Sequence, residues 1–256
     1  MLRQSNGTFQ VISTDHLRSL IDDPALMTRI AAVHALGDVW AMGAQPQVGL
    51  ASIVVPQMSA DLQARTLSEI TQVATEVLGA AGAQLVGGHT TMGAELTIGF
   101  TVTGRKDALP LTLSGAQPGD VLVLTRPIGS GVILAADMVG QAHGRFVAAA
   151  LAIMGQAQDR EAAVLAPVAH AMTDVTGFGL AGHVKAICAA SGLDAELWQA
   201  AIPIYAGAQA LSDAGVASTL MSVNRTDALI QGGADALLYD PQTAGGLLAA
   251  VPAEQS

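Results

Sequence analysis

Alternating apolar and polar residues mark several strands in the first half of the chain. Residues 8–15 (TFQVISTD) combine β-branched residues with an acid, Asp15, at the C-terminal end of the predicted strand. Residues 48–56 (VGLASIVVP) predict a second strand that stops at its proline, and residues 95–104 alternate as a half-buried strand does. Residues 83–90 (AQLVGGHT) predict a short strand that runs into a glycine turn.

Helical spacing of apolar residues predicts two long helices between these strands. The first follows Asp23 as N-cap, has Pro24 at its first position, and extends to about Met42. The second covers residues 59–82, with a serine N-cap and an apolar stripe on one face.

A stretch rich in charge, proline and glycine, residues 105–120, predicts a domain boundary. A second series follows it: a strand over 120–125, a glycine loop, a helix from Val132, and a long helical region that ends near Ala166. Strands and helices are mixed in both halves. We therefore expect an α+β protein of two mixed α/β layered domains, residues 1–106 and 107–256.

Composition and charge narrow the class of protein. Hydrophobic residues make up 51% of the chain and charged residues 12%, which is typical of a folded protein with a large core. The net charge of −10 argues against a nucleic-acid partner. No apolar run is long enough for a bilayer and no signal peptide is visible, so we expect a cytoplasmic protein without membrane contact. The single cysteine, Cys188, is expected to be a buried structural thiol.

Three aspartates are candidates for holding a metal ion. Asp15 and Asp174 stand at the ends of predicted elements and Asp38 stands on an apolar helix, with few basic residues nearby in sequence, which suits Mg²⁺ bound together with substrate phosphates. Each acid alone could instead be a cap or a surface charge. His34 precedes Asp38 by one helical turn, so the two could form a metal site, or the carboxylate could simply hold the histidine. The second interpretation is favoured.

Four glycine-rich segments could bring backbone amides close to a phosphate, or could be ordinary turns. They match neither a P-loop nor a dinucleotide-binding fingerprint. Thr176 could act as the N-cap of the helix that follows the third segment. The segments are GGHTT (87–91), PIGSG (127–131), TGFGLAG (176–182) and TAGG (243–246).

Six motifs in order resemble the selenophosphate synthetases (selenide, water dikinases) of the aminoimidazole-ribonucleotide-synthetase superfamily. They lie at residues 13–15, 22–46, 86–90, 114–132, 171–183 (AMTDVTGFGLAGH) and 240–248 (DPQTAGGLL). The resemblance implies a two-domain fold whose N-terminal domains pair across a homodimer into a β-barrel-like core. It also implies conversion of ATP, selenide and water to selenophosphate, AMP and phosphate.

The resemblance assigns site residues by motif. It implies that Asp38 and Asp174 bind Mg²⁺ and that Asp15 and Asp38 lie at the nucleotide phosphates. It further implies that Gly88, His89 and Thr90 contact ATP, in the family from the partner subunit.

The chain also departs from the family pattern. Family members begin with a glycine-rich segment that carries a reactive Cys or Sec, a lysine and another metal-binding aspartate, and none of these is present. Position 34 is His where several members have Asn, and position 126 is Arg where Lys is common. We therefore expect a fragment, incomplete at both ends, with no catalytic residue of its own. Two alternatives remain: a non-catalytic nucleotide-binding or dimerisation module of a larger protein, and a sister ATP-dependent enzyme with a different small nucleophile.

Overall fold

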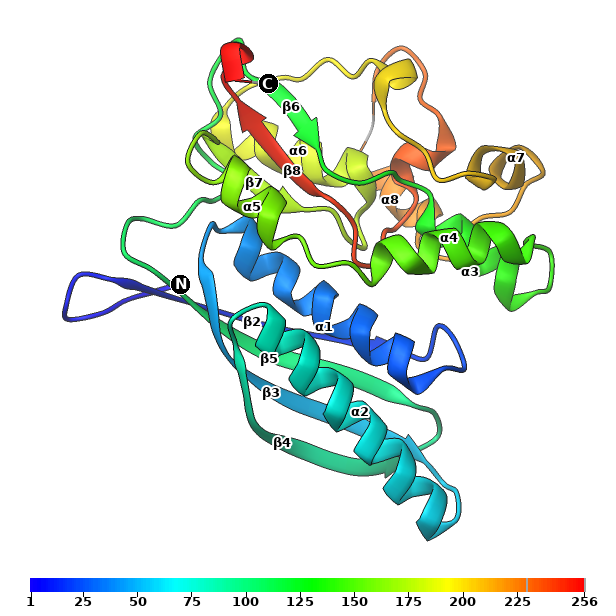
Figure 1. Ribbon diagram of the computed structural model, residues 1–256. Helices are drawn as coiled ribbons and strands as arrows, with labels where there is room; N and C mark the ends of the chain where they lie inside the picture. Colours follow the sequence, from blue (N-terminus) through cyan, green and yellow to red (C-terminus); the bar gives the residue numbers. More distant parts are fainter. Residues whose placement is uncertain (229, 256) are drawn as a thin grey trace. The chain divides into compact units, whose positions relative to one another are not determined.

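The computed structural model describes residues 1–228 and 230–255; Leu229 and Ser256, which the predicted second domain includes, lie outside the described residues. The chain divides into two compact units (Figure 1). The first comprises residues 1–110 with 155–159, and the second comprises residues 111–154 with the chain from 160 onward. Both units combine a sheet with helices, which confirms the prediction of two mixed α/β domains.

The first unit contains a five-stranded sheet in the order β1-β2-β5-β3-β4. Neighbouring strands are antiparallel except β3 and β4, which are parallel because helix α2 connects them as a crossover. The elements are β1 (Leu2–Arg3), β2 (Phe9–Arg18), α1 (Pro24–Ala41), β3 (Gln45–Pro56), α2 (Ala60–Ala80), β4 (Gln84–Gly93) and β5 (Thr97–Lys106).

Helices α1 and α2 lie side by side on one face of this sheet (Figure 1). Because α1 packs against both the sheet and α2, it is buried almost all round. The predicted caps are confirmed: Asp23 Oδ1 accepts a hydrogen bond from the Leu26 amide at 2.9 Å, and Ser59 Oγ accepts one from the Leu62 amide at 3.4 Å.

Two sequence predictions for this unit were wrong. Strand β2 does not end at Asp15 but continues to Arg18, since residues 16–18 pair with β5 as the earlier residues do. Residues 87–90 do not form a turn: they lie within β4, which pairs in parallel with β3 as far as Gly93. A bulge between Gly49 and Leu50 adjusts the register and so lets the pairing continue through the glycines.

The other face of the sheet carries exposed apolar side chains. Ile12, Leu50 and Val86 are 48%, 45% and 56% exposed. Strand β4 is an edge strand with β3 as its hydrogen-bonded neighbour in the sheet, and nearly all of its residues are exposed. Exposed edges and apolar sheet faces of this kind are common sites of association.

The second unit is built on an antiparallel sheet in the order β6-β8-β7. All five residues of the central strand β8 are buried. The predicted helical region up to Ala166 is two helices, α4 and α5. The elements are β6 (Val121–Leu124), α3 (Ser130–Met138), α4 (Gly144–Met154), α5 (Asp159–Leu165), β7 (Ala171–Asp174), α6 (Gly179–Ser191), α7 (Ala208–Asp213), α8 (Met221–Asp227) and β8 (Leu247–Val251), with 3₁₀ turns at Gln199–Ala201, Ala236–Tyr239 and Ala253–Gln255. Across the described part of both units, every helix is too short or too polar to cross a membrane.

Candidate functional site

Two of the predicted acids meet in the first unit, where α1 packs on β2. The carboxyl groups of Asp15 and Asp38 share a hydrogen bond, and Ser13 Oγ donates another to Asp38 Oδ2. Burial, together with the hydrogen bond and the charge of Asp38, raises the pKa of Asp15 to about 6. Two adjacent carboxyl groups repel each other once both are ionised, and a divalent cation would relieve that repulsion.

His34 lies one helical turn before Asp38 and is mostly buried. Burial lowers the pKa of its imidazole, although the nearby charge of Asp38 acts in the opposite direction. In the residues that the structure describes, no three His, Cys, Asp or Glu side chains are grouped so as to hold a metal ion. A cation at Asp15 and Asp38 would therefore need further ligands such as phosphate oxygens or water, as Mg²⁺ usually has.

The predicted ATP contacts Gly88, His89 and Thr90 are exposed on the edge strand β4. A Cβ at Gly88 would lie 2.1 Å from the Ala51 carbonyl oxygen, so this glycine is required by the close approach of β4 to β3. Strands β5 and β3 separate β4 from β2, which carries Asp15. The distance is three strand spacings, about 14 Å. Within one chain, the structure does not bring this motif to the acid pair.

The third predicted acid, Asp174, lies in the second unit at the end of β7 and is 7% exposed. Strands β6 and β7 end, and β8 begins, at the same edge of the sheet. The loops that follow β6 and β7 therefore meet the loop that precedes β8. The Thr125 amide donates to the Leu247 carbonyl at 3.0 Å, and the Val175 amide donates to the Gly246 carbonyl at 2.8 Å. Three of the predicted motifs thus converge beside Asp174.

The glycines at this edge are explained mainly by packing. A Cβ at Gly245 would lie 2.0 Å from the Val175 carbonyl oxygen, and one at Gly246 would lie 2.6 Å from the Arg126 amide nitrogen. Gly179 has a φ of +70°, and a Cβ there would lie 2.8 Å from the Tyr239 carbonyl carbon. Gly177 differs, because a Cβ there would meet nothing within 4 Å.

Side chains from the DPQTAGG segment cap the N-terminus of α3. Gln242 Oε1 accepts hydrogen bonds from the Gly129 and Ser130 amides at 3.0 and 3.1 Å. Asp240 Oδ2 accepts from the Gly131 and Val132 amides at 2.9 and 3.2 Å. The hypothesis that the PIGSG loop binds a phosphate is therefore wrong for this structure, since protein acceptors already take these amides.

Asp240 and Arg126 are both buried at this edge. Asp240 is completely buried, and burial raises its pKa to about 7 although the donors from Val132, Gln242 and Gly131 act against that rise. Arg126 is 5% exposed, burial lowers its pKa, and its Nη1 donates to the Ala244 carbonyl at 2.7 Å. Ala244 has a φ of +45°, which is uncommon for a residue other than glycine.

Thr176 is not the N-cap of α6, which begins at Gly179 after Phe178. Its amide instead donates to His183 Nε2 at 3.0 Å. Its carbonyl accepts from the Gln242 amide at 3.0 Å. The Asn224 side chain donates to the Gly177 carbonyl at 2.8 Å. Sequence reasoning missed the roles of His183, Gln242 and Asn224, although the first two stand inside the quoted motifs.

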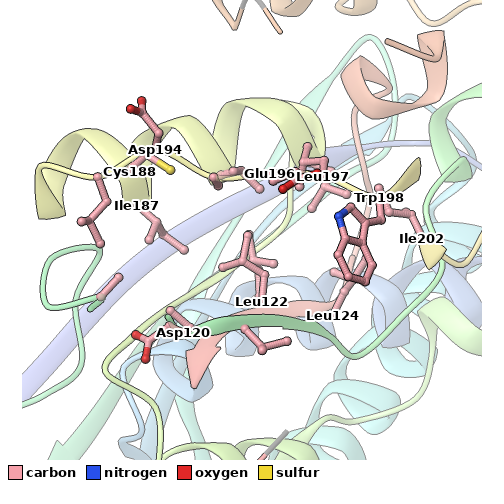
Figure 2. A pocket seen from close by; sticks show the side chains of 18 of the residues that line it. Asp120, Leu122, Leu124, Ile187, Cys188, Asp194, Glu196, Leu197, Trp198 and Ile202 are labelled. Atoms are coloured by element: carbon pink, nitrogen blue, oxygen red, sulfur yellow. The ribbon is translucent and has the colours of Figure 1, made fainter. Parts of the chain in front are cut away.

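A separate apolar groove of about 720 Å³ lies in the second unit between α6, the β6–β8 face and the segment 193–203 (Figure 2). Trp198 and Ile202 line it opposite Ile187 and Cys188. The thiol of Cys188 has a pKa raised by burial, which does not suit a nucleophile. None of the site residues predicted from the sequence lines this groove.

Comparison with known proteins matches each half of the chain to a domain of a known family. Residues 1–106 match the N-terminal domain of AIR synthase related proteins, and residues 117–256 match their C-terminal domain. The selenide, water dikinase of Myxococcus xanthus (strain DK1622) is 35% identical over an alignment of 266 residues. This alignment covers 99% of this chain and 75% of that protein. The selenide, water dikinase of Burkholderia ambifaria (strain MC40-6) is 36% identical over 255 residues, covering 95% and 71%.

Solved structures share the fold at lower identity. Thiamine-monophosphate kinase from Stenotrophomonas maltophilia K279a superposes with a TM-score of 0.74 at 20% identity, covering 100% of this chain and 78% of that one. The hydrogenase maturation protein HypE in complex with ATP gives 0.70 at 18% identity, covering 96% and 70%. The chain belongs to the AIR synthase related family and, within it, to the selenide, water dikinases.

Proposed function

We propose that this chain is the ATP-binding core of a selenophosphate synthetase, which converts ATP, selenide and water to selenophosphate, AMP and phosphate. The relatives named selenide, water dikinase support the reaction. The observation that carries the proposal is the Asp15–Asp38 pair, because it joins two carboxyl groups, one with a raised pKa, where the family motifs lie. Perturbed carboxyl groups of this kind are typical of functional sites.

Asp38 and Asp174 would hold Mg²⁺, with Asp15 at the phosphates beside Asp38. All three are carboxylates, the ligands that Mg²⁺ prefers, and Asp15 and Asp38 are adjacent in the structure. When bound, Mg²⁺ neutralises polyphosphate charge and orients the transferred group. The protein side chains fix the positions of these oxygens: Ser13 holds the Asp38 carboxylate, and the loop contacts around Thr176 hold the backbone beside Asp174.

Residues 1–106 would form the ATP-binding and dimerisation domain, and residues 107–256 the synthetase-like domain. The exposed apolar sheet face and the edge strand β4 favour a homodimer with a β-barrel-like core. Gly88, His89 and Thr90 are separated from the acid pair of their own chain by strands β5 and β3. We assign their ATP contact, as the family resemblance implies, to the site of the partner subunit.

The partners expected are thus ATP, selenide and a second copy of the chain, with no nucleic acid and no membrane, in the cytoplasm. The net charge of −10 supports the exclusion of nucleic acid. No residue of this chain is assigned the role of the family's reactive Cys or Sec, and Cys188 is not a candidate for it.

Calorimetric titration of ATP into the protein, with Mg²⁺ and then with EDTA, tests the proposal. We expect binding that depends on Mg²⁺ and that Asp38→Asn weakens by about 10-fold or more. Glu69→Gln, which changes an exposed acid on α2, is the matched control and should bind as the wild type does. In an activity assay, AMP and phosphate should form from ATP only when selenide is present. Stimulation by thiamin phosphate instead of selenide would assign a sister activity.

A further inference from the structure

Gln242 connects the three loops that meet at the Asp174 edge of the second sheet. Its backbone amide donates to the Thr176 carbonyl at 3.0 Å, two residues after Asp174. Its side-chain oxygen accepts from the amides of Gly129 and Ser130 and, at 3.0 Å, from Ser130 Oγ. One residue of the DPQTAGG segment thus holds the loop after β6 and the loop after β7 together.

The side chain has no spare hydrogen-bonding capacity for another task. Gln242 is 3% exposed, and its Nε2 donates to the Asp240 carbonyl oxygen at 2.7 Å and to Asp240 Oδ2 at 3.1 Å. Three donors share the two lone pairs of the oxygen, and the nitrogen donates both of its protons, so the hydrogen-bonding capacity of the carboxamide is filled. Buried amides satisfied in this way fix one arrangement of the backbone around them.

The two residues that follow Asp174 are held by the DPQTAGG segment and by His183. The Val175 amide donates to the Gly246 carbonyl at 2.8 Å, and the Thr176 carbonyl accepts from Gln242. His183 takes the Thr176 amide on the other side. Asp174 is the last residue of β7, so the backbone held by these contacts follows it directly.

We propose that Gln242 is a positioning residue for Asp174, so that the DPQTAGG segment tunes the affinity of the site for Mg²⁺ without contacting the metal or the nucleotide. The proposal rests on the assignment of Asp174 as a ligand of Mg²⁺ with ATP. Removal of residues that orient metal ligands typically weakens metal binding by about 10- to 100-fold.

The test is a titration of Mg²⁺ into the protein at a fixed concentration of ATP, followed by nucleotide binding, with thermal unfolding of each variant measured alongside. Gln242→Leu should raise the half-saturating Mg²⁺ concentration by about 10-fold. Gln199→Leu is the matched control: Gln199 also accepts a backbone amide, of Asp235 at 2.7 Å, and donates to a carbonyl, of Gly233 at 3.1 Å, but it bonds to none of the three loops. It should leave the half-saturating concentration unchanged.

A double mutant separates positioning from a general loss of structure. If Gln242 acts through Asp174, then Gln242→Leu should add nothing to the Mg²⁺ defect of Asp174→Asn, while its effect on the melting temperature should persist. Independent, multiplying defects would overturn the proposal, and so would a Gln242→Leu variant that melts earlier yet keeps the wild-type Mg²⁺ dependence.

Three further outcomes keep the test decisive. If Gln242→Leu does not fold, Ser130→Ala takes its place, because it removes one donor to the same oxygen. It should raise the half-saturating Mg²⁺ concentration by about 3-fold, on the order of one neutral hydrogen bond. No change in that concentration would overturn the proposal. If the wild type binds ATP without any Mg²⁺ dependence, the proposed function itself fails. In the third outcome, the wild type shows Mg²⁺-dependent ATP binding that Asp174→Asn impairs and Gln242→Leu leaves unchanged. That result would reject only the positioning role of Gln242.

Discussion

Asp15 on β2 and Asp38 on α1 share a hydrogen bond between their carboxyl groups, in a protein whose relatives are named selenide, water dikinase. The pKa of Asp15 is raised to about 6, so the folded protein holds this proton more tightly than the unfolded chain does. The stabilisation is therefore complete below pH 4 and is lost as the pH rises from about 4 to 6. At neutral pH, without a cation, the pair opposes folding.

The first prediction is that Asp15→Asn stabilises the protein at pH 7.5 in EDTA. The gain should be on the order of 1 kcal/mol after allowance for solvent screening, or a rise of about 2–4 °C in the melting temperature. At pH 4.5 the variant and the wild type should melt much closer together, because Asp15 then keeps its proton. Thermal unfolding at the two pH values measures this difference. An equal gain at both pH values would mean that the pKa of Asp15 is not raised in the folded protein.

The second prediction concerns Asp240, whose pKa burial raises to about 7. The sign is the same: the folded state binds the proton more tightly, so the wild type loses stability relative to Asp240→Asn as the pH rises from about 4 to 7. The slope should reach about 1.4 kcal/mol per pH unit. Urea denaturation at pH 5, 6, 7 and 8 measures it. Asp194→Asn, which changes an exposed acid of the same unit, is the control variant and is measured alongside.

The third prediction distinguishes two glycines of the second unit, Gly245 in the TAGG segment and Gly177 in the TGFGLAG segment. Gly245→Ala should destabilise the protein by about 1–3 kcal/mol or more, because the new Cβ would clash with the Val175 carbonyl oxygen. Gly177→Ala should be neutral or slightly stabilising, since its surroundings are open and its φ is not positive. Denaturant titration of both variants checks this. If Gly177→Ala is stable but binds ATP poorly, that glycine provides clearance for the ligand.

The fourth prediction tests the proposed homodimer. Leu50→Asp places a charge on the exposed apolar face of the first sheet, so it should convert dimers to monomers in light scattering coupled to size-exclusion chromatography. Val164→Asp changes a side chain on α5 that is 72% exposed, and should leave the dimer intact. A wild-type protein that is already monomeric at micromolar concentration would remove the basis for an ATP contact from the partner's β4.

Features encoded by neighbouring residues were predictable from the sequence. The caps at Asp23 and Ser59 depend on hydrogen bonds three residues along the chain, and both form as predicted. The acid at position 38 stood out because an unpaired charge in an apolar helix is costly, and the structure supplies its partners, Ser13 and Asp15.

Features that depend on distant parts of the chain were not predictable in the same way. Nothing local shows that β4 continues through its glycines, because parallel pairing with β3 stabilises that extension. The PIGSG loop has the composition of a phosphate-binding loop, and only contact with Gln242 and Asp240, more than a hundred residues later, shows that its amides are taken. The role of His183 likewise needs the folded loop, since a histidine in a helix has no partner that sequence alone reveals.

The position of β8 has a consequence for biosynthesis. It is the central strand of the second sheet, yet among the described strands it is the last to be made, and it pairs Leu248 with Leu124 and Leu247 with Asp174. Before β8 is made, β6 and β7 have no strand to pair with, and before residues 240 and 242 are made, α3 lacks its caps. Such non-local pairing folds slowly. The edge that carries Asp174 therefore forms only after β8 has been made, and the unpaired strands of the nascent chain are prone to aggregation until then.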